Sequence, residues 1–416
     1  ATLAQLNTAY DLLANPVATT TTLTTAADAV TGTDNGDTLH GVVDADTAAN
    51  NTLNASDVIS MGSGTDTLNV TFETATSAAM PSASISGVEV FNIKNVSGQT
   101  LALDMAPISG ATTLNVNMST NIVNITNIES GTTGVVTGNG VVVNAASSFG
   151  YVAAATSSTV NIAGGTTAGA ITVTGTGLLA ETYTSTGAAN TTGLITNAAT
   201  TTAVTIDATT DLTATMTGTA VASLTVTGAG DVDLNGATLD ATIITIDASG
   251  ASGDVDLIVG NVATATNPGT VDIADVNVTG GSGNDDISFA GIDAGDDINV
   301  NAGAGDDTVT IDEVVETSSA TVSGDVIVGG DGTDILAVDV TSANAQTAVT
   351  TVSGFEELTV TNALVTGGIT VANFQAGLNV VNLAAGGIGE ITFEAGSNTV
   401  NLVAPLAAGT LALTDT

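Results

Sequence analysis

Residues 325–338 read Asp325-Val-Ile-Val-Gly-Gly-Asp-Gly-Thr-Asp334-Ile-Leu-Ala-Val338, and the fold that we expect follows from this segment. Two short apolar runs lie on either side of a turn that contains three glycines. Glycine adopts backbone dihedral angles that other residues rarely adopt, and short apolar runs between turn residues are typical of β-strands. The segment therefore predicts a strand, a tight glycine turn and a second strand.

The same pattern occurs near the start of the chain. Residues 57–70 read Asp57-Val-Ile-Ser-Met-Gly-Ser-Gly-Thr-Asp66-Thr-Leu-Asn-Val70 and align with residues 325–338 without a gap. Each copy is followed by a Ser-Gly-x-Glu segment, at Ser86–Glu89 and at Ser353–Glu356. We interpret the two regions as copies of one module.

The region between the two modules contains a shorter repeat. Apolar-polar-apolar runs at 204–206, 224–226 and 244–246 recur every 20 residues, and a similar run at 271–273 follows 27 residues later. In each run the apolar residues can face a core while the polar residue faces solvent. We therefore predict an all-β fold, a parallel β-solenoid or β-roll with one rung per period, with an antiparallel sandwich as the alternative.

The composition excludes several classes of function. The 416 residues include 42 Asp and Glu but a single basic residue, Lys94, so that the formal net charge is −41 at pH 7. Nucleic acids bind through Lys and Arg, and we exclude DNA and RNA as direct partners. With one His and no Cys, cysteine nucleophiles and most histidine-based triads are excluded as well. Oxygen ligands remain, and hard cations such as Ca²⁺ prefer them.

The apolar content indicates an ordered protein despite this charge. Hydrophobic residues make up 43% of the chain and the mean hydropathy is +0.41, which is enough to build a core. No run of 18 apolar residues occurs, so we expect no transmembrane segment.

The glycine turns match a metal-binding repeat. The pattern G-G-x-G-x-D-x-U-x, in which U is a large apolar residue, is the calcium-binding nonapeptide of RTX proteins. It is complete at 280–288 and 329–337, and less complete matches occur at 61–68, 302–309, 32–39 and 294–298. Carbonyl and carboxylate oxygens of such turns suit Ca²⁺. The candidate calcium-site residues are Asp37, Asp57, Gly62, Gly64, Asp66, Gly281, Gly283, Asp285, Asp297, Gly303, Gly305, Asp307, Asp325, Gly330, Gly332 and Asp334.

One turn supplies only about half of a calcium site, so successive turns must stack. Two pairs of Asp are nine residues apart, and we interpret nine as the one-repeat spacing that stacking requires; they are Asp57 with Asp66 and Asp325 with Asp334. A third series is spaced less regularly, by 12 and 10 residues: Asp285, Asp297 and Asp307. The alternative interpretation is that these Gly- and Asp-rich turns simply connect strands.

Other polar residues have simpler interpretations. His40 follows the loose turn at Asp37, and a lone surface His is more often solvated than a metal ligand. Pairs of Asp in the central region could suggest glycoside cleavage, but we interpret them as outward-facing acidic ladders because aromatic platforms and cations are scarce there. These pairs are Asp231 with Asp233, Asp254 with Asp256 and Asp272 with Asp275.

The repeats also suggest a domain division. Apolar residues fall on one helical face between Thr2 and Asn15, and Pro16 follows, which predicts a short N-terminal helix. The predicted parts are an N-terminal helical cap or docking segment (1–30), a first RTX-like β module (31–110), a Thr/Ala/Val-rich β-solenoid (111–279), and a second RTX-like β module with C-terminal strands (280–416).

The calcium nonapeptides, the Ser-Gly-x-Glu segments and the Thr/Ala/Val/Gly composition resemble bacterial surface-layer proteins of the RTX type. The similarity to the Caulobacter surface-layer protein family is closest between Gly303 and Val360, where segments that begin at Gly303, Gly329 and Gly354 occur in the order that the family shows. This resemblance implies export by type I secretion without a cleaved N-terminal signal, and a two-dimensional lattice on lipopolysaccharide in the presence of calcium.

We therefore expect a non-enzymatic, extracellular protein that binds Ca²⁺ and assembles with copies of itself into a surface layer. Lipopolysaccharide or another cell-surface glycan is the expected second partner. The first alternative is a calcium-dependent extracellular filament or adhesin. The second is a β-helical polysaccharide-degrading enzyme, which would require a groove with clustered carboxylates.

Overall fold

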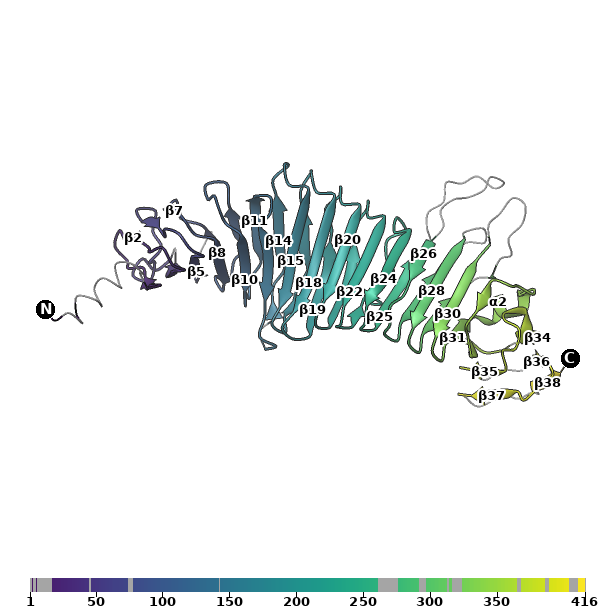
Figure 1. The fold of residues 1–416 in the computed structure, drawn as a ribbon. Coiled ribbons are helices and arrows are strands. Elements are labelled where there is room, and N and C mark those ends of the chain that lie inside the picture. The colour runs from purple at the N-terminus through teal and green to yellow at the C-terminus, as the bar shows by residue number, and fades with distance from the viewer. Residues whose placement is uncertain are drawn as a thin grey trace. The chain divides into compact units, whose positions relative to one another are not determined.

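A computed structural model of the protein describes residues 2, 5, 17–44, 46–73, 78–141, 143–260, 276–291, 297–312, 314–315, 324–364, 368–385, 389–403 and 411–415. The chain forms two compact units, residues 1–201 and 202–416. Within each unit short strands pair in parallel with strands from the next turn of the chain, which makes each unit a parallel β-solenoid (Figure 1). The predicted all-β parallel solenoid is confirmed, and the antiparallel sandwich is wrong.

In unit 1 two long sheets and one short sheet form the sides of the coil. The first sheet contains β1 (Thr20–Thr22), β3 (Thr38–Val43), β5 (Thr67–Phe72), β8 (Val90–Asn95), β10 (Thr113–Asn117), β12 (Thr133–Thr137), β15 (Ser157–Ala163) and β18 (Ala180–Thr186). The second contains β6 (Ala78–Ala79), β9 (Leu101–Asp104), β11 (Val123–Ile128), β13 (Val143–Asn144), β14 (Ser147–Tyr151), β16 (Thr167–Ala168), β17 (Ile171–Thr174) and β19 (Asn190–Thr196). The short sheet contains β2 (Ala29–Thr31), β4 (Val58–Ser60) and β7 (Ser84–Ser86).

The core of unit 1 consists of apolar side chains stacked in register from rung to rung. Leu39, Leu68, Phe91 and Leu114 occupy matching positions on β3, β5, β8 and β10 and are fully buried. The residues between them point outward, as the alternation of apolar and polar residues predicts. Each rung buries its apolar face only against its neighbours, so the stack stabilises itself through repetition.

Unit 2 has the same construction. Its first sheet contains β20 (Ala203–Ala208), β22 (Ser223–Gly228), β24 (Thr245–Ala251), β26 (Val276–Thr279), β28 (Ile298–Ala304), β30 (Val326–Asp331) and β32 (Val352–Ser353). Its second contains β21 (Leu212–Thr217), β23 (Val232–Asp233), β25 (Val255–Gly260), β27 (Asp286–Ala290), β29 (Thr308–Ile311), β31 (Ile335–Val338), β33 (Glu357–Val360), β35 (Val380–Leu383) and β37 (Thr399–Leu402). A short sheet contains β34 (Gly368–Thr370), β36 (Gly389–Phe393) and β38 (Leu411–Asp415).

The 20-residue period of the central region holds for only one step. Val204 on β20 pairs with Leu224 on β22, as the period predicts. Leu224 then pairs with Ile246 rather than with Ile244, which is 38% exposed. The connecting loop between β23 and β24 is therefore two residues longer than the period assumed. The run at 271–273 lies outside the described residues.

Helix is rare in the described part of the chain. It comprises α2 (Val340–Ala345) and the short 3-10 helix η1 (Val371–Asn373), besides Gln5. The N-terminal helix predicted over residues 2–15 lies outside the described residues, except for Thr2 and Gln5. None of the described helices has the length and apolar character that crossing a membrane would need.

Candidate functional site

A row of buried carboxylates runs along unit 2, at the corner where the strands of its second sheet begin. Asp285, Asp307 and Asp334 each directly precede a strand, and at most 2% of each residue is exposed. The backbone N–H of Asp285 donates to Oδ1 of Asp307 at 2.8 Å, and that of Asp307 donates to Oδ1 of Asp334 at 2.9 Å. Each carboxylate therefore receives the main-chain N–H of the preceding rung. We call Asp285, Asp307, Asp334 and Glu356 the unit 2 carboxylate ladder.

Unit 1 contains a shorter row of the same kind. The N–H of Asp37 donates to Oδ1 of Asp66 at 2.6 Å, and the N–H of Asp66 donates to Oε2 of Glu89 at 2.8 Å. Asp37 and Asp66 are buried at the starts of β3 and β5. We call Asp37, Asp66 and Glu89 the unit 1 carboxylate ladder.

The last member of each ladder was not among the predicted site residues. Glu356 accepts the N–H of Asp334 at 2.8 Å, just as Glu89 accepts the N–H of Asp66. Both belong to the Ser-Gly-x-Glu segments that follow the two modules. The sequence therefore contained a signal for both residues, since the same segment occurs after each module and places a Glu one rung beyond the last Asp of the ladder.

The prediction that aspartates nine residues apart stack on each other is wrong. Asp57 precedes β4 and Asp66 precedes β5, so the two lie at different corners of one rung. The carboxylate of Asp57 instead accepts the N–H of Asp28 at 2.9 Å, 29 residues away. A full turn of these coils takes 22 to 29 residues at the ladders, because each rung has more than one strand.

Three ladder carboxylates keep one oxygen without a partner. Oδ2 of Asp66, of Asp307 and of Asp334 is buried and forms no hydrogen bond. Buried polar atoms nearly always have a hydrogen-bond partner, and an unpaired carboxylate oxygen in the interior costs several kcal/mol or shifts its pKa. These three oxygens are therefore the positions at which a cation would supply the missing interaction.

The pKa values of the ladder carboxyls reflect this environment. Burial raises the pKa of Asp307 to about 6, although the hydrogen bond from the N–H of Asp285 acts to lower it. Burial also raises the pKa of Asp285 to about 6 and raises those of Asp66 and Asp334. Nearby carboxylates add to the effect at each position, which indicates a concentration of unneutralised negative charge.

Other predicted ligands are already satisfied by the protein. Although burial acts to raise the pKa of Asp37, hydrogen bonds from Thr33 and Thr19 to its two oxygens hold that pKa below its usual value. Both oxygens of Asp57 accept main-chain N–H groups, as do both oxygens of Asp285. These three residues fit the role of strand caps better than that of cation ligands.

The remaining two predicted aspartates lie at a different corner of unit 2. Asp325 precedes β30, is buried, and accepts the N–H of Ile298 through Oδ1 at 2.8 Å. Asp297 precedes β28, and its Oδ1 is buried without a hydrogen-bond partner. The structure therefore separates Asp297 and Asp325 from the ladder that contains Asp307 and Asp334.

The glycine turns stack closely enough that only glycine fits. A Cβ atom on Gly330 would lie 1.9 Å from the carbonyl oxygen of Gly303, and one on Gly303 would lie 2.3 Å from that of Gly281. Gly305 and Gly332, which lie two residues further along the same turns, are packed equally closely against carbonyl oxygens of the preceding turns. Carbonyl oxygens of one turn thus project toward the next. Positive φ angles occur at Gly62, Gly64, Gly303, Gly305, Gly330 and Gly332, but not at Gly281 or Gly283.

The central Asp pairs form rows on the outside of unit 2. Asp233, Asp256 and Asp286 stand in register on β23, β25 and β27, and burial together with the charges of Asp286 and Asp233 raises the pKa of Asp256 to about 6. A second row forms main-chain hydrogen bonds from rung to rung; we call it the exposed ladder, and its members are Asp211, Asp231, Asp254, Asn284 and Asp306. Asp272 and Asp275 lie outside the described residues.

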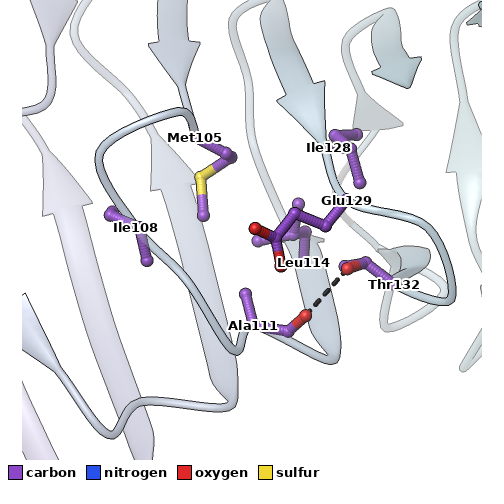
Figure 2. A pocket seen from close by; sticks show the side chains of 7 residues that line it. All are labelled: Met105, Ile108, Ala111, Leu114, Ile128, Glu129 and Thr132. Atoms are coloured by element: carbon purple, nitrogen blue, oxygen red, sulfur yellow. Dashed lines mark hydrogen bonds between the residues drawn. The ribbon is translucent and has the colours of Figure 1, made fainter. Parts of the chain in front are cut away.

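Two hollows lie among the described residues of unit 1, and Asp37, Asp66 and Glu89 are not among the residues that line them. One, lined by side chains of the loops after β9 and β11, has a volume of about 10 Å³, room for about one water molecule (Figure 2). The hydroxyl of Thr132 donates to the carbonyl of Ala111 beside it at 2.7 Å. The other has a volume of about 240 Å³, and the residues that line it include Met80, Pro81, Ile85, Asp104 and Pro107.

The described side chains alone do not make a complete metal site. Among the described residues, no group of three or more His, Cys, Asp or Glu side chains could hold a metal ion together. A cation at Asp66, Asp307 or Asp334 would therefore need main-chain carbonyl oxygens from the stacked turns. Such mixed carboxylate and carbonyl coordination is characteristic of Ca²⁺.

The raised pKa values predict that the metal-free protein becomes more stable on mild acidification. Asp285 and Asp307 bind protons with a pKa of about 6 when folded and with an ordinary value near 3.8 when unfolded, so the folded state gains protons first as the pH falls. In a chelator, the free energy of unfolding should rise by about 2 kcal/mol between pH 7.5 and pH 5. Urea unfolding at the two pH values measures this; equal or lower stability at pH 5 would contradict it.

No family model and no curated protein matches the chain.

Proposed function

We propose that the protein is a non-catalytic, extracellular, calcium-binding β-solenoid that assembles with copies of itself into a layer on a bacterial surface. One observation carries the calcium part of the proposal: Asp66, Asp307 and Asp334 each keep a buried carboxylate oxygen without a hydrogen bond. The same carboxylates lie at glycine turns whose carbonyl oxygens project from one turn toward the next. This arrangement supports binding of a hard cation by oxygen ligands from two rungs.

The charge of the chain supports a role for a divalent cation in assembly. At a net charge of −41, copies of the protein repel one another over about 8–10 Å at physiological salt. Calcium bound at the turns would lower this repulsion and would neutralise carboxylates that burial otherwise disfavours. Association of the protein with itself should then depend on calcium. A layer and a filament both fit this dependence, and electron microscopy of the assembled protein distinguishes them.

A calcium titration tests the proposal. A ligand present at 100 times its dissociation constant stabilises the folded state by about 2.7 kcal/mol, so calcium should raise the melting temperature by more than about 5 °C over that in a chelator. Circular dichroism follows the melting, and light scattering follows the particle mass. Magnesium serves as the control, because its demand for near-octahedral geometry suits these turns poorly. Identical melting and identical mass in calcium and chelator would refute the proposal.

A further inference from the structure

The outward face of the first sheet in unit 1 carries no acidic side chain on strands β3, β5, β8, β10, β12, β15 and β18. The outward positions of these seven strands are occupied mainly by Thr and Asn. Glu181 is the only acidic residue on them, and it points inward and is 1% exposed. The strands of the second sheet of unit 1 carry one acidic residue, Asp104 on β9, so this face is the one of the two that has no outward acidic side chain. We call it the Thr/Asn face.

The basic residues of the chain lie on this same face. Lys94, which is the only Lys or Arg of the protein, is exposed on β8. His40, the only His, is exposed on β3. The Thr/Asn face is therefore neutral to weakly positive, and a polyanionic surface can approach it with less repulsion than the acidic rows of unit 2 offer.

The face is regular and its side chains are held in place. Asn92 donates through Nδ2 to Oδ1 of Asn69 at 2.8 Å, and Asn115 donates to Asn92 in the same way at 2.9 Å. A parallel row of half-exposed Thr residues stands in register and is interrupted by Val90 on β8, and no side-chain hydrogen bond is described for its hydroxyls: Thr38, Thr67, Thr113, Thr133, Thr159 and Thr182. Thr is stiff at χ1, so ordering this surface on binding costs little entropy.

The area of the face is sufficient for a specific dimer. Seven strands spaced about 4.8 Å apart and about six residues long, at about 3.3 Å per residue, cover roughly 650 Å². Two such faces together would bury about 1,300 Å², within the range of stable protein interfaces.

We propose that the Thr/Asn face binds the same face of a second copy of this chain. The proposal rests on the self-assembly proposed above and assigns one of its contacts. A copy of the chain fits because two of these faces bring no carboxylates against each other, whereas like charges set face to face in an interface cost several kcal/mol. The regular rows of Thr and Asn are also self-complementary under a two-fold axis, as an isologous interface requires.

Thr159→Asp tests the proposal, because it places a negative charge on β15, within the face. Each copy would then bury an unpaired carboxylate in the dimer interface. The matched control is Thr172→Asp, which makes the same change at a half-exposed outward position of β17 in the second sheet of the same unit. Thr159→Asn is the conservative variant and adds no charge.

Sedimentation velocity and light scattering over a range of protein concentrations, in calcium and in a chelator, provide the measurement. Thr159→Asp should weaken self-association at least tenfold, while Thr172→Asp and Thr159→Asn should associate like wild type. Equal association of the two Asp variants would overturn the proposal. A wild-type protein that stays monomeric but binds a bacterial surface polysaccharide, with Thr159→Asp impairing that binding, would also overturn it in favour of a glycan.

The same measurements distinguish this proposal from the proposed function. Each variant must first show the circular dichroism spectrum and the calcium-dependent melting of wild type, so that a folding defect is recognised. If calcium stabilises the wild type but both Asp variants associate equally, the Thr/Asn interface fails and calcium binding stands. If Thr159→Asp alone dissociates the protein while calcium has no effect on melting, the interface stands and the calcium proposal fails.

Discussion

Replacing Gly330 by Ala is expected to destabilise unit 2 by about 3 kcal/mol or more. The φ angle of Gly330 is +128°, and the new Cβ would lie 1.9 Å from the carbonyl oxygen of Gly303 on the preceding turn. A backbone carbonyl cannot rotate out of the way as a flexible side chain can, so the turns must separate. Backbone strain of this kind costs about 1–3 kcal/mol by itself, and separation of the turns adds the loss of packing between the rungs.

Gly377→Ala is the matched control for this prediction. Gly377 also has a positive φ, +81°, but a Cβ there would meet no atom within 4 Å. This variant should lose only the about 1–2 kcal/mol that a left-handed backbone costs an L-residue. Urea unfolding of both variants in a chelator, where calcium cannot contribute, isolates the steric effect of the stacked turns. Equal losses at Gly330 and Gly377 would mean that the turns do not stack as closely as the structure indicates.

The solenoid could be predicted from the sequence because its signal repeats. Alternation such as Val204-Thr205-Ile206 places two side chains in the core and one outside, and the structure buries and exposes these residues accordingly. The register was harder to predict. A loop longer by two residues makes Ile246 rather than Ile244 the partner of Leu224, and loop lengths leave no trace in the apolar pattern.

The candidate site could be predicted only in part, and for a related reason. Residue types and turn chemistry identified the carboxylates that the structure buries, including Asp66, Asp307 and Asp334. Their neighbours could not be inferred from a nine-residue spacing, because the number of strands per rung decides which residues stack. The sequence also did not reveal which carboxylate oxygens already accept hydrogen bonds. The donors to Asp37, for example, are Thr19 and Thr33, which lie on separate segments.

Replacing Asp307 by Asn should have opposite effects on stability without and with calcium. The amide oxygen of Asn can still accept the N–H of Asp285, so the ladder hydrogen bond is kept and only the charge is lost. Burial raises the pKa of Asp307 to about 6, which means that the charged form destabilises the metal-free fold at neutral pH. In a chelator at pH 7.5, D307N should therefore be more stable than wild type by about 2 kcal/mol.

In saturating calcium the order of stability should reverse. Wild type gains the binding free energy of an ion at this turn, about 3 kcal/mol at 100 times its dissociation constant, and D307N loses most of that gain because a neutral amide is a weaker calcium ligand. The control is D306N, one residue away on the exposed ladder. In that ladder Asn284 already accepts a main-chain N–H from the next rung, as Asp306 does. D306N also removes one negative charge but should change stability little in either condition.

Thermal and urea unfolding of wild type, D307N and D306N, each in chelator and in calcium, complete the experiment. A strand cap that binds no metal and a calcium ligand predict the same result in chelator, since both leave a buried charge that Asn removes. They differ in calcium, where a simple cap would leave D307N the more stable protein. That outcome would assign the buried carboxylates of the ladder to holding the rungs together through main-chain hydrogen bonds alone, and the reversal would assign them to calcium.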